Sequence, residues 1–288
     1  MIRLRIRHRT TYRYREPVRL LPHCLMLRPR ESHELRLLTM SLTVTPPALV
    51  TWASDVAGNT LATATFQTMV DTLTIDSDVE IELNAAPWPV FDIAASAISY
   101  PFRYSDDEWT DLGALATPQS PDPFRRVHDW ARAFIYSTPT DTLSLLKDIN
   151  AGTGAGISYV VREEEGTQTP IETLERRSGS CRDLAVLFVE AVRSLGFGAR
   201  IVSGYLFNPD QQAAWPWGAG RSTHAWAEVY LPGAGWITFD PTNRSVGGTN
   251  LIPVAVGRDI RQVMPVVGSF VGMSDAFLGL WVEVSVTA

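Results

Sequence analysis

Apolar and charged residues alternate from the second residue of the chain. Ile2, Leu4 and Ile6 are separated by single arginines, and this period of two predicts a half-buried β-strand. Similar alternation recurs in three further runs, at residues 35–44, 60–70 and 72–83. Turn-forming sequences such as TPP and DVAGN separate these runs. We therefore expect residues 1–90 to form an all-β domain, either a sandwich or a barrel.

The hydrophobic period changes after this region. Prolines gather on either side of position 100, which indicates a connector over residues 91–120. Apolar residues then recur at helical spacing behind Asp122 and again over residues 140–149. The clearest helix covers residues 181–195, where apolar side chains recur at i, i+3, i+4 and i+7 and glycines follow the last turn.

Strands return after the long helix. Three runs predict strands, at residues 200–206, 224–231 and 236–240. These elements predict an α+β fold, in which a helix that begins with a cysteine packs on an antiparallel sheet. We place this core at residues 121–246 and treat residues 247–288 as a C-terminal β extension, packed on the core or on the β-domain.

Cys181 begins the long helix. A helix N-terminus carries unpaired N–H groups and a partial positive charge, and both stabilise a thiolate and a developing oxyanion. Ser180 is a typical N-cap, and Asp183 either completes a capping box or contacts substrate, with the cap favoured. The alternative for Cys181 is a small buried apolar residue. Cys24 lies in a strand-like run, and we assign it a structural role.

His224 opens one predicted strand and Asp240 closes the next. An antiparallel hairpin brings those two strand ends together. A histidine held in position by a carboxylate is the general base of a thiol enzyme. The pair therefore predicts a Cys–His–Asp arrangement with Cys181 as the nucleophile.

The register of this hairpin tests that prediction. A simple four-residue loop pairs Leu231 with Trp236, which places Asp240 on the face away from His224. With Tyr230 opposite Trp236, Asp240 and His224 become diagonal neighbours on one face. A catalytic pair therefore predicts an irregular loop or a bulge at the glycines of the turn.

Composition excludes several classes of protein. The chain of 288 residues has a formal net charge of −6 and is 45% hydrophobic, which argues against nucleic-acid binding by bulk charge and supplies enough apolar residues for one or two cores. Residues 1–36 hold ten arginines against three glutamates. Because these arginines alternate with apolar residues, a solvated strand face is favoured over a basic patch for an anionic partner.

Two cysteines cannot form a disulfide framework, and no CxxC pair indicates a metal site. The N-terminus lacks the apolar core of a signal peptide, and no run of eighteen apolar residues marks a membrane span. We expect a cytoplasmic protein with reduced thiols that uses no metal or other cofactor. Its expected partner is a peptide or protein substrate, with no nucleic acid and no membrane, and the oligomeric state is open.

Two segments, GSCRDLAVLFVEAVRSLGFGARIVSGY and HAWAEVYLPGAGWITFDPT, resemble the transglutaminase-like superfamily, which is related to papain-type cysteine proteases. The N-terminal and C-terminal regions resemble those of bacterial multi-domain members. The resemblance implies that Cys181 is the nucleophile, His224 the base and Asp240 the orienting carboxylate. Papain-type enzymes use a glutamine at the oxyanion hole and animal transglutaminases use a tryptophan, so Tyr159 and Gln168 are the upstream candidates here.

Three tryptophans and one glycine run remain. Trp215 and Trp217 precede His224 and either wall the substrate site or anchor a loop on the core. Trp226 shares the face of His224 in a regular strand and is a substrate-site candidate or a packing neighbour. The GTGAGIS run at 152–158 lacks the ending of a phosphate loop, so we expect a flexible loop there.

The expected chemistry is cysteine-dependent acyl transfer on peptide or protein amides through a thioester. Water as the acceptor gives a peptidase or amidase, which we favour because indiscriminate crosslinking in the cytoplasm would be harmful. An amine as the acceptor gives a protein-glutamine transglutaminase. A binding or scaffolding module without catalysis is the alternative from another class, and the presence of all three residues counts against it.

Overall fold

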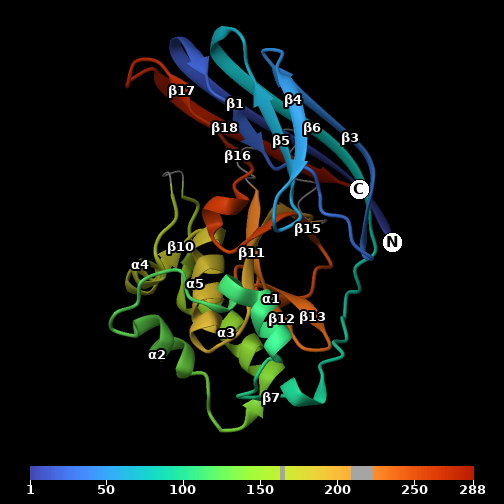
Figure 1. Cartoon of the computed structure of the whole chain (residues 1–288), viewed down its shortest axis with the longest axis vertical. Helices are drawn as coiled ribbons and strands as arrows, with labels where there is room; N and C mark the ends of the chain where they lie inside the picture. Colours follow the sequence, from blue (N-terminus) through green and yellow to red (C-terminus); the bar gives the residue numbers. More distant parts are fainter. Residues whose placement is uncertain (163–165, 209–222) are drawn as a thin grey trace.

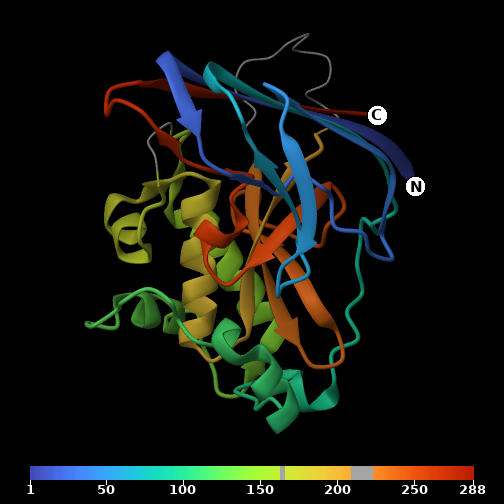
Figure 2. The same ribbon diagram turned by 45° about the horizontal axis from the view of Figure 1, so that its top comes forward.

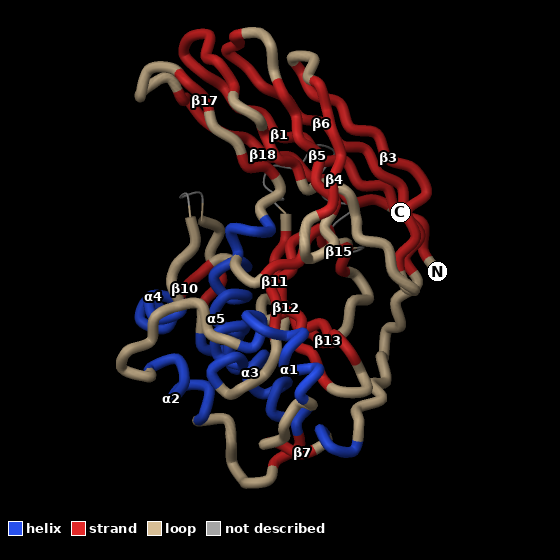
Figure 3. Tube along the Cα trace, in the orientation of Figure 1, coloured by secondary structure: helices blue, strands red, loops and turns tan. Residues whose placement is uncertain are grey.

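The computed structural model describes residues 1–162, 166–208 and 223–288. A β-sandwich occupies one end of the molecule and a helix-and-sheet core the other (Figure 1). In the described part of the chain, the helices lie in the core and its flanking segments (Figure 3). The α+β fold class is therefore confirmed.

The N-terminal region forms a sandwich rather than a barrel. One antiparallel sheet has the order β17-β1-β6-β3, with β18 also paired with β1, and the other has the order β16-β2-β5-β4. Val18, Leu25, Leu73 and Ile75 are buried between the sheets. The sandwich strands are β1 (Ile2–Leu20), β2 (His23–Leu25), β3 (Leu35–Thr45), β4 (Leu49–Ser54), β5 (Thr60–Thr65), β6 (Met69–Leu83), β16 (Val266–Val267), β17 (Phe270–Val271) and β18 (Phe277–Thr287).

The arginines of β1 lie on a solvated strand face. Leu4 and Ile6 are buried, and the arginines between them point outward. Arg5 pairs with Asp78 at 2.6 Å across β1 and β6, and its neighbours on the same face form similar cross-strand pairs with acidic residues. These opposite charges satisfy each other within the sheet.

The core sheet has the order β14-β13-β12-β11-β15. Helix α5 (Cys181–Ser194) packs on this sheet, with Phe188 against Phe239 at 5.4 Å between ring centroids. The core strands are β11 (Ala199–Leu206), β12 (His224–Leu231), β13 (Gly235–Asp240), β14 (Ser245–Val246) and β15 (Leu251–Gly257). The other helices are α1 (Asp106–Leu112), α2 (Arg126–Arg132), α3 (Thr142–Gly156), α4 (Pro170–Arg176), η1 (Ala95–Ala97), η2 (Gly113–Ala116) and η4 (Ile260–Val263). Two short pairs complete the fold, β7 (Ser99–Tyr100) with β8 (Thr140–Asp141) and β9 (Ser158–Tyr159) with β10 (Ser178–Gly179).

The expected loop at 152–158 is wrong over most of its length, because α3 continues to Gly156. A Cβ atom at Gly152 would lie 2.3 Å from Phe134 Cζ, and one at Gly154 would lie 2.4 Å from the carbonyl oxygen of Pro241. The glycines therefore permit close packing of α3 rather than a flexible loop. This packing outweighs the low helix propensity of glycine.

The C-terminal segment contributes to both ends of the molecule. β15 pairs with β11 in the core sheet, whereas β18 pairs with β1 in the sandwich over ten residue pairs, from Arg5–Thr287 to Tyr14–Phe277. The chain therefore returns to the sandwich after completing the core (Figure 1).

Candidate active site

Cys181 occupies the first turn of α5, as the sequence predicts. Asp183 Oδ2 accepts hydrogen bonds from the backbone N–H of Ser180 at 2.7 Å and from its hydroxyl at 2.8 Å. Asp183 is 0% exposed, so it caps the helix and does not line open surface.

Asp183 also ties two upstream loops to the start of the helix. Its Oδ1 accepts a hydrogen bond from the backbone N–H of Gln168 at 2.7 Å, and the Arg162 guanidinium donates to it at 3.0 Å. Gly179 lies so close that an added Cβ would be 2.8 Å from Asp183 Cβ. The segment before Cys181 is therefore held by a buried carboxylate that needs glycine beside it.

The β12–β13 hairpin has the irregular turn that a His–Asp pair requires. Leu231 pairs with Gly235 and Tyr230 with Trp236, around a three-residue loop at 232–234. Gly235 has a φ of +72°, a conformation that favours glycine. This register continues to place position 226 opposite Asp240, so Asp240 and His224 are diagonal neighbours on one face.

The structure brings Cys181, His224 and Asp240 together. His224 Nε2–H donates to Asp240 Oδ2 at 2.8 Å, and the Cys181 side chain lies close enough to the imidazole to raise its pKa. Since Nε2 faces Asp240, Nδ1 is the nitrogen left for the thiol. His224 is 8% exposed and Asp240 is 1% exposed, so little water competes for these bonds.

Charge at this site favours a protonated imidazole. Burial lowers the pKa of His224, but the hydrogen bond to Asp240 and the nearby Cys181 side chain outweigh it and raise the pKa above its usual value. Burial likewise acts to raise the pKa of Asp240, but the bonds to His224 and Asn243 hold that pKa below its usual range. Asp240 is therefore a carboxylate beside an imidazolium.

Asn243 is a site residue that the sequence reasoning missed. Its side-chain amide donates to Asp240 Oδ2 at 2.6 Å, and its backbone N–H donates to Oδ1 at 3.2 Å. The backbone N–H of Thr242 donates to Oδ1 at 3.0 Å. A carboxylate followed two and three residues later by N–H donors is an Asx-type turn, and the DPTN sequence carries that signal.

Of the two oxyanion-hole candidates, Tyr159 lies beside the thiol. β9 runs parallel to β10, with Tyr159 opposite Gly179, two residues before Cys181. Partial burial, followed by the proximity of Cys181, raises the pKa of the Tyr159 hydroxyl. Gln168 is buried and its Nε2 donates to the carbonyl of Ser178 at 3.3 Å, so its amide holds the backbone of β10.

The three tryptophans have different outcomes. Trp226 is 1% exposed and its ring stacks on His224, with centroids 5.9 Å apart and an interplanar angle of 28°. It therefore supports the imidazole rather than lining open surface for a substrate. Trp215 and Trp217 lie outside the described residues.

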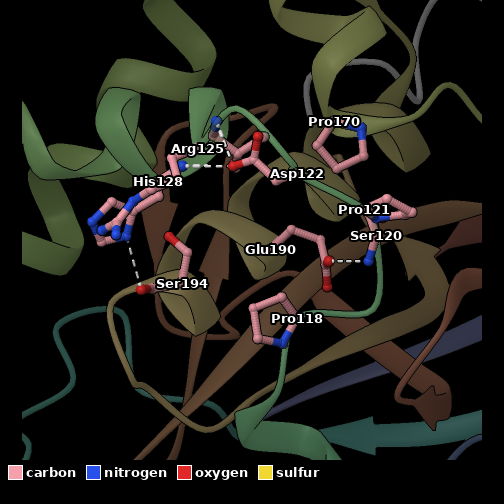
Figure 4. Close-up of a pocket in the computed structure, with 10 residues that line it drawn as sticks. Pro118, Ser120, Pro121, Asp122, Arg125, His128, Pro170, Glu190 and Ser194 are labelled. Carbon is pink, nitrogen blue, oxygen red and sulfur yellow. Dashed lines mark hydrogen bonds between the residues drawn. The ribbon is translucent and has the colours of Figure 1, made fainter.

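A cavity of about 380 Å³ lies elsewhere on the core, beside α2, and includes none of the candidate residues. Figure 4 shows the Glu190 carboxylate bonded to Ser120, and His128 bonded to the carbonyl of Ser194. Asp122 accepts backbone N–H groups of the first turn of α2. The carboxylates of Glu190 and Asp122 therefore hold backbone segments in place.

The described ranges contain no grouping of three His, Cys, Asp or Glu side chains suited to a metal ion. In the same ranges, no helix has the length and apolar character needed to cross a membrane.

Comparison with known proteins agrees with the fold. Residues 124–241 match the model of the transglutaminase-like superfamily, and residues 4–82 match that of the bacterial transglutaminase-like N-terminal region. The chain is therefore a member of the transglutaminase-like superfamily, with the N-terminal region of its bacterial members.

Two relatives and one solved structure extend the comparison. An uncharacterized protein of Mycobacterium tuberculosis is 29% identical over 284 residues, covering 92% of this chain and 87% of the relative. An uncharacterized protein of Mycobacterium leprae is 35% identical over 115 residues, covering 40% of each chain. A candidate cysteine protease from Cytophaga hutchinsonii has the same fold, with a TM-score of 0.76 and 20% identity over 99% of this chain and 91% of that one.

Proposed function

We propose that this protein is a cysteine-dependent hydrolase of peptide or protein amides. The observation that carries the proposal is the buried row Cys181–His224–Asp240, in which one imidazole is hydrogen-bonded to a carboxylate and lies close enough to a thiol for that thiol to raise its pKa. The raised pKa of His224 supports a thiolate–imidazolium pair, which is the reactive form of a cysteine nucleophile.

The proposed reaction has two halves. The Cys181 thiolate attacks the amide carbonyl carbon, and the backbone N–H at the start of α5, together with the Tyr159 hydroxyl, donates to the developing oxyanion. The His224 imidazolium then protonates the leaving amine as the C–N bond breaks, which leaves a thioester on Cys181. Water, deprotonated by the now neutral His224, hydrolyses the thioester and restores the thiol.

Asp240 and Trp226 have supporting roles in this proposal. Asp240 accepts the Nε2 proton, so it selects the tautomer in which Nδ1 faces the thiol. Trp226 limits rotation of the imidazole by stacking on it. The Cytophaga hutchinsonii protein of the same fold is a candidate cysteine protease, which agrees with this class of reaction.

Hydrolysis of a fluorescently labelled unfolded protein tests the proposal. We expect wild-type protein to release labelled peptides, and Cys181→Ala to lower the rate by about 10⁴-fold or more. Cys24→Ser is the matched control and keeps the wild-type rate, since Cys24 lies in the sandwich. A primary amine added to the assay separates the outcomes, because its incorporation in excess of hydrolysis identifies a transglutaminase. Hydrolysis that is unchanged in Cys181→Ala would contradict both activities.

A further inference from the structure

The loop between β4 and β5, residues 55–59, is held rigid by its own hydrogen bonds. Asp55 Oδ1 accepts the backbone N–H groups of Ala57 at 2.9 Å and Asn59 at 2.8 Å, while Oδ2 accepts the Asn59 side-chain amide at 2.8 Å. Gly58 has a φ of +74°, which lets the loop turn. The Asn59 side chain therefore has one fixed orientation, and the residue is 0% exposed.

This loop reaches from the sandwich to the edge of the core sheet (Figure 2). The Asn59 amide pairs with the backbone of Val256 in β15, accepting its N–H and donating to its carbonyl, both at 2.8 Å. Arg30 donates to the same amide oxygen at 2.7 Å. With Asp55, these partners use all four hydrogen-bonding positions of the amide. The Asn59 side chain thus pairs with the edge strand β15 in the way that the backbone of a neighbouring strand would.

A row of side chains connects Val256 with the candidate histidine. Val256 lies opposite Val202 in β11, and Val202 lies opposite Trp226 in β12. These three side chains form one buried apolar cluster, against which Ala57 of the loop packs. Trp226 then stacks on His224.

Trp226 has little freedom within this row. A Cβ atom at Gly204 would lie 2.7 Å from Trp226 Cη2, so the indole is pressed against the backbone of β11. One side of the Trp226 indole packs against the core sheet and the apolar cluster. Ala57, in the loop at 55–59, covers this cluster from the side of the sandwich. Displacement of β15 therefore changes the packing of Trp226 directly.

We propose that Asn59 is a positioning residue for His224: by fixing β15 and the cluster of Val256, Val202 and Trp226, it sets the plane of the imidazole between Cys181 and Asp240. The N-terminal β-domain is then a functional part of the active site, although it supplies no reacting group. This inference rests on the proposed function, since it takes His224 as the base.

The rate of Cys181 alkylation by iodoacetamide, followed against pH, tests this role without a known substrate. All variants carry Cys24→Ser, so that Cys181 is the one thiol. We expect Asn59→Ala to lower the rate at mildly acidic pH by about tenfold, toward that of His224→Ala, because misplacing a catalytic group costs reactivity. Circular dichroism confirms that each variant is folded.

Tyr205→Phe is the matched control. It removes the hydrogen bond between Tyr205 and His8, which is another buried polar contact between sandwich and core, but leaves the Trp226 cluster intact. We expect it to keep the wild-type pH profile. A folded Asn59→Ala variant with the wild-type profile, or an equal loss in Tyr205→Phe, would overturn the proposal.

Ala57→Gly decides the question if Asn59→Ala does not fold. It removes one methyl group from the cluster and keeps every hydrogen bond of Asn59. We therefore expect Cys181 alkylation about threefold slower than in the parent, and an unchanged rate overturns the proposal.

Failure of the proposed function gives a different set of alkylation rates. If His224→Ala reacts as fast as its parent, the function and this inference both fail; if only His224→Ala is slow, the inference alone fails.

Discussion

A single imidazole lies between the thiol and the carboxylate of the candidate site. His224 is hydrogen-bonded to Asp240 through Nε2 and lies near Cys181, and all three residues are buried. The backbone N–H of Thr242 donates to Oδ1 of this carboxylate, and the Asn243 amide donates to Oδ2, the oxygen that also accepts from His224. The protonation states of His224 and Asp240 therefore depend on hydrogen bonds that hold each side chain in one orientation.

Replacing Asp240 by Asn should shift the alkaline limit of activity. Asp240 raises the pKa of His224, so Asp240→Asn lowers that pKa and removes the imidazolium at a lower pH. We expect the alkaline limb of the kcat/KM profile to move to lower pH and the maximum rate to fall by about 10²-fold to 10⁴-fold. The pH profile of peptide hydrolysis measures both, and an unmoved alkaline limb contradicts the assignment of Asp240.

Tyr159→Phe should lower kcat and leave KM nearly unchanged. The hydroxyl lies near Cys181 and is assigned to the oxyanion, which forms only in the transition state. The expected loss in kcat is about 10-fold to 10³-fold. Tyr136→Phe is the control, because Tyr136 is exposed and lies on a separate loop. A change in KM alone would assign Tyr159 to substrate binding instead.

At the scale of elements, the site depends on three strand or helix ends that meet. α5 presents Cys181 at its first turn, β12 presents His224 at its start and β13 presents Asp240 at its end. The short β9–β10 pair adds Tyr159 beside the thiol. Each functional residue thus lies at a terminus, where the backbone is held by neighbouring elements and the side chain reaches past the sheet.

Gly179→Ala should damage this arrangement. Its new Cβ would lie 2.8 Å from Asp183 Cβ, and the buried Asp183 carboxylate is fixed by four hydrogen-bond donors. We expect a loss of about 1–3 kcal/mol in the free energy of unfolding, together with slower alkylation of Cys181. Gly156→Ala, with open space around its new methyl group, should change stability by less than about 1 kcal/mol. Denaturant unfolding compares the two, and equal effects would refute the close-packing argument.

Sequence periodicity predicted the elements in which apolar residues recur at regular spacing. The 181–195 pattern located α5 to within one residue, and the position of His224 and Asp240 predicted the irregular turn of the β12–β13 hairpin. The helical spacing over residues 140–149 predicted the first part of α3, but its C-terminal part was expected to be a loop, since Gly152 and Gly154 are intrinsically poor helix formers. Glycine is needed at these two positions because Phe134 and Pro241 pack closely against α3. The local sequence does not encode this tertiary contact.

At the scale of the molecule, the sandwich and the core share buried polar contacts. His8 of β1 is 2% exposed; its Nδ1 lies 3.0 Å from the Tyr205 hydroxyl and its Nε2 lies 2.9 Å from Thr10 Oγ1. Asn59 and Val256 form the second contact, across 197 residues of sequence. Neither contact was predictable, because no local pattern relates residues so far apart.

The free energy of unfolding should decrease at acidic pH because of His8. Burial lowers the pKa of His8 to about 4, below the unfolded value of 6.5. The unfolded chain therefore binds a proton that the folded chain rejects, and stability that is complete above pH 6.5 is lost as the pH falls toward 4. The pKa of His224 is raised, so its contribution is constant in this window and is lost only at alkaline pH.

His8→Gln should remove this dependence. We expect the wild type to lose about 3 kcal/mol more than His8→Gln across that window. His33→Gln is the control, because the His33 side chain is 90% exposed. Urea unfolding at several pH values measures the difference, and parallel curves for wild type and His8→Gln would contradict the role of His8.

The most direct test of the central claim is the alkylation rate of Cys181 at mildly acidic pH, compared between Cys24→Ser and Cys24→Ser/His224→Ala. A thiolate paired with the His224 imidazolium predicts fast alkylation in the first protein and a loss of about tenfold or more in the second. Equal rates, close to that of a free thiol, would contradict a catalytic pair and favour a binding or scaffolding module.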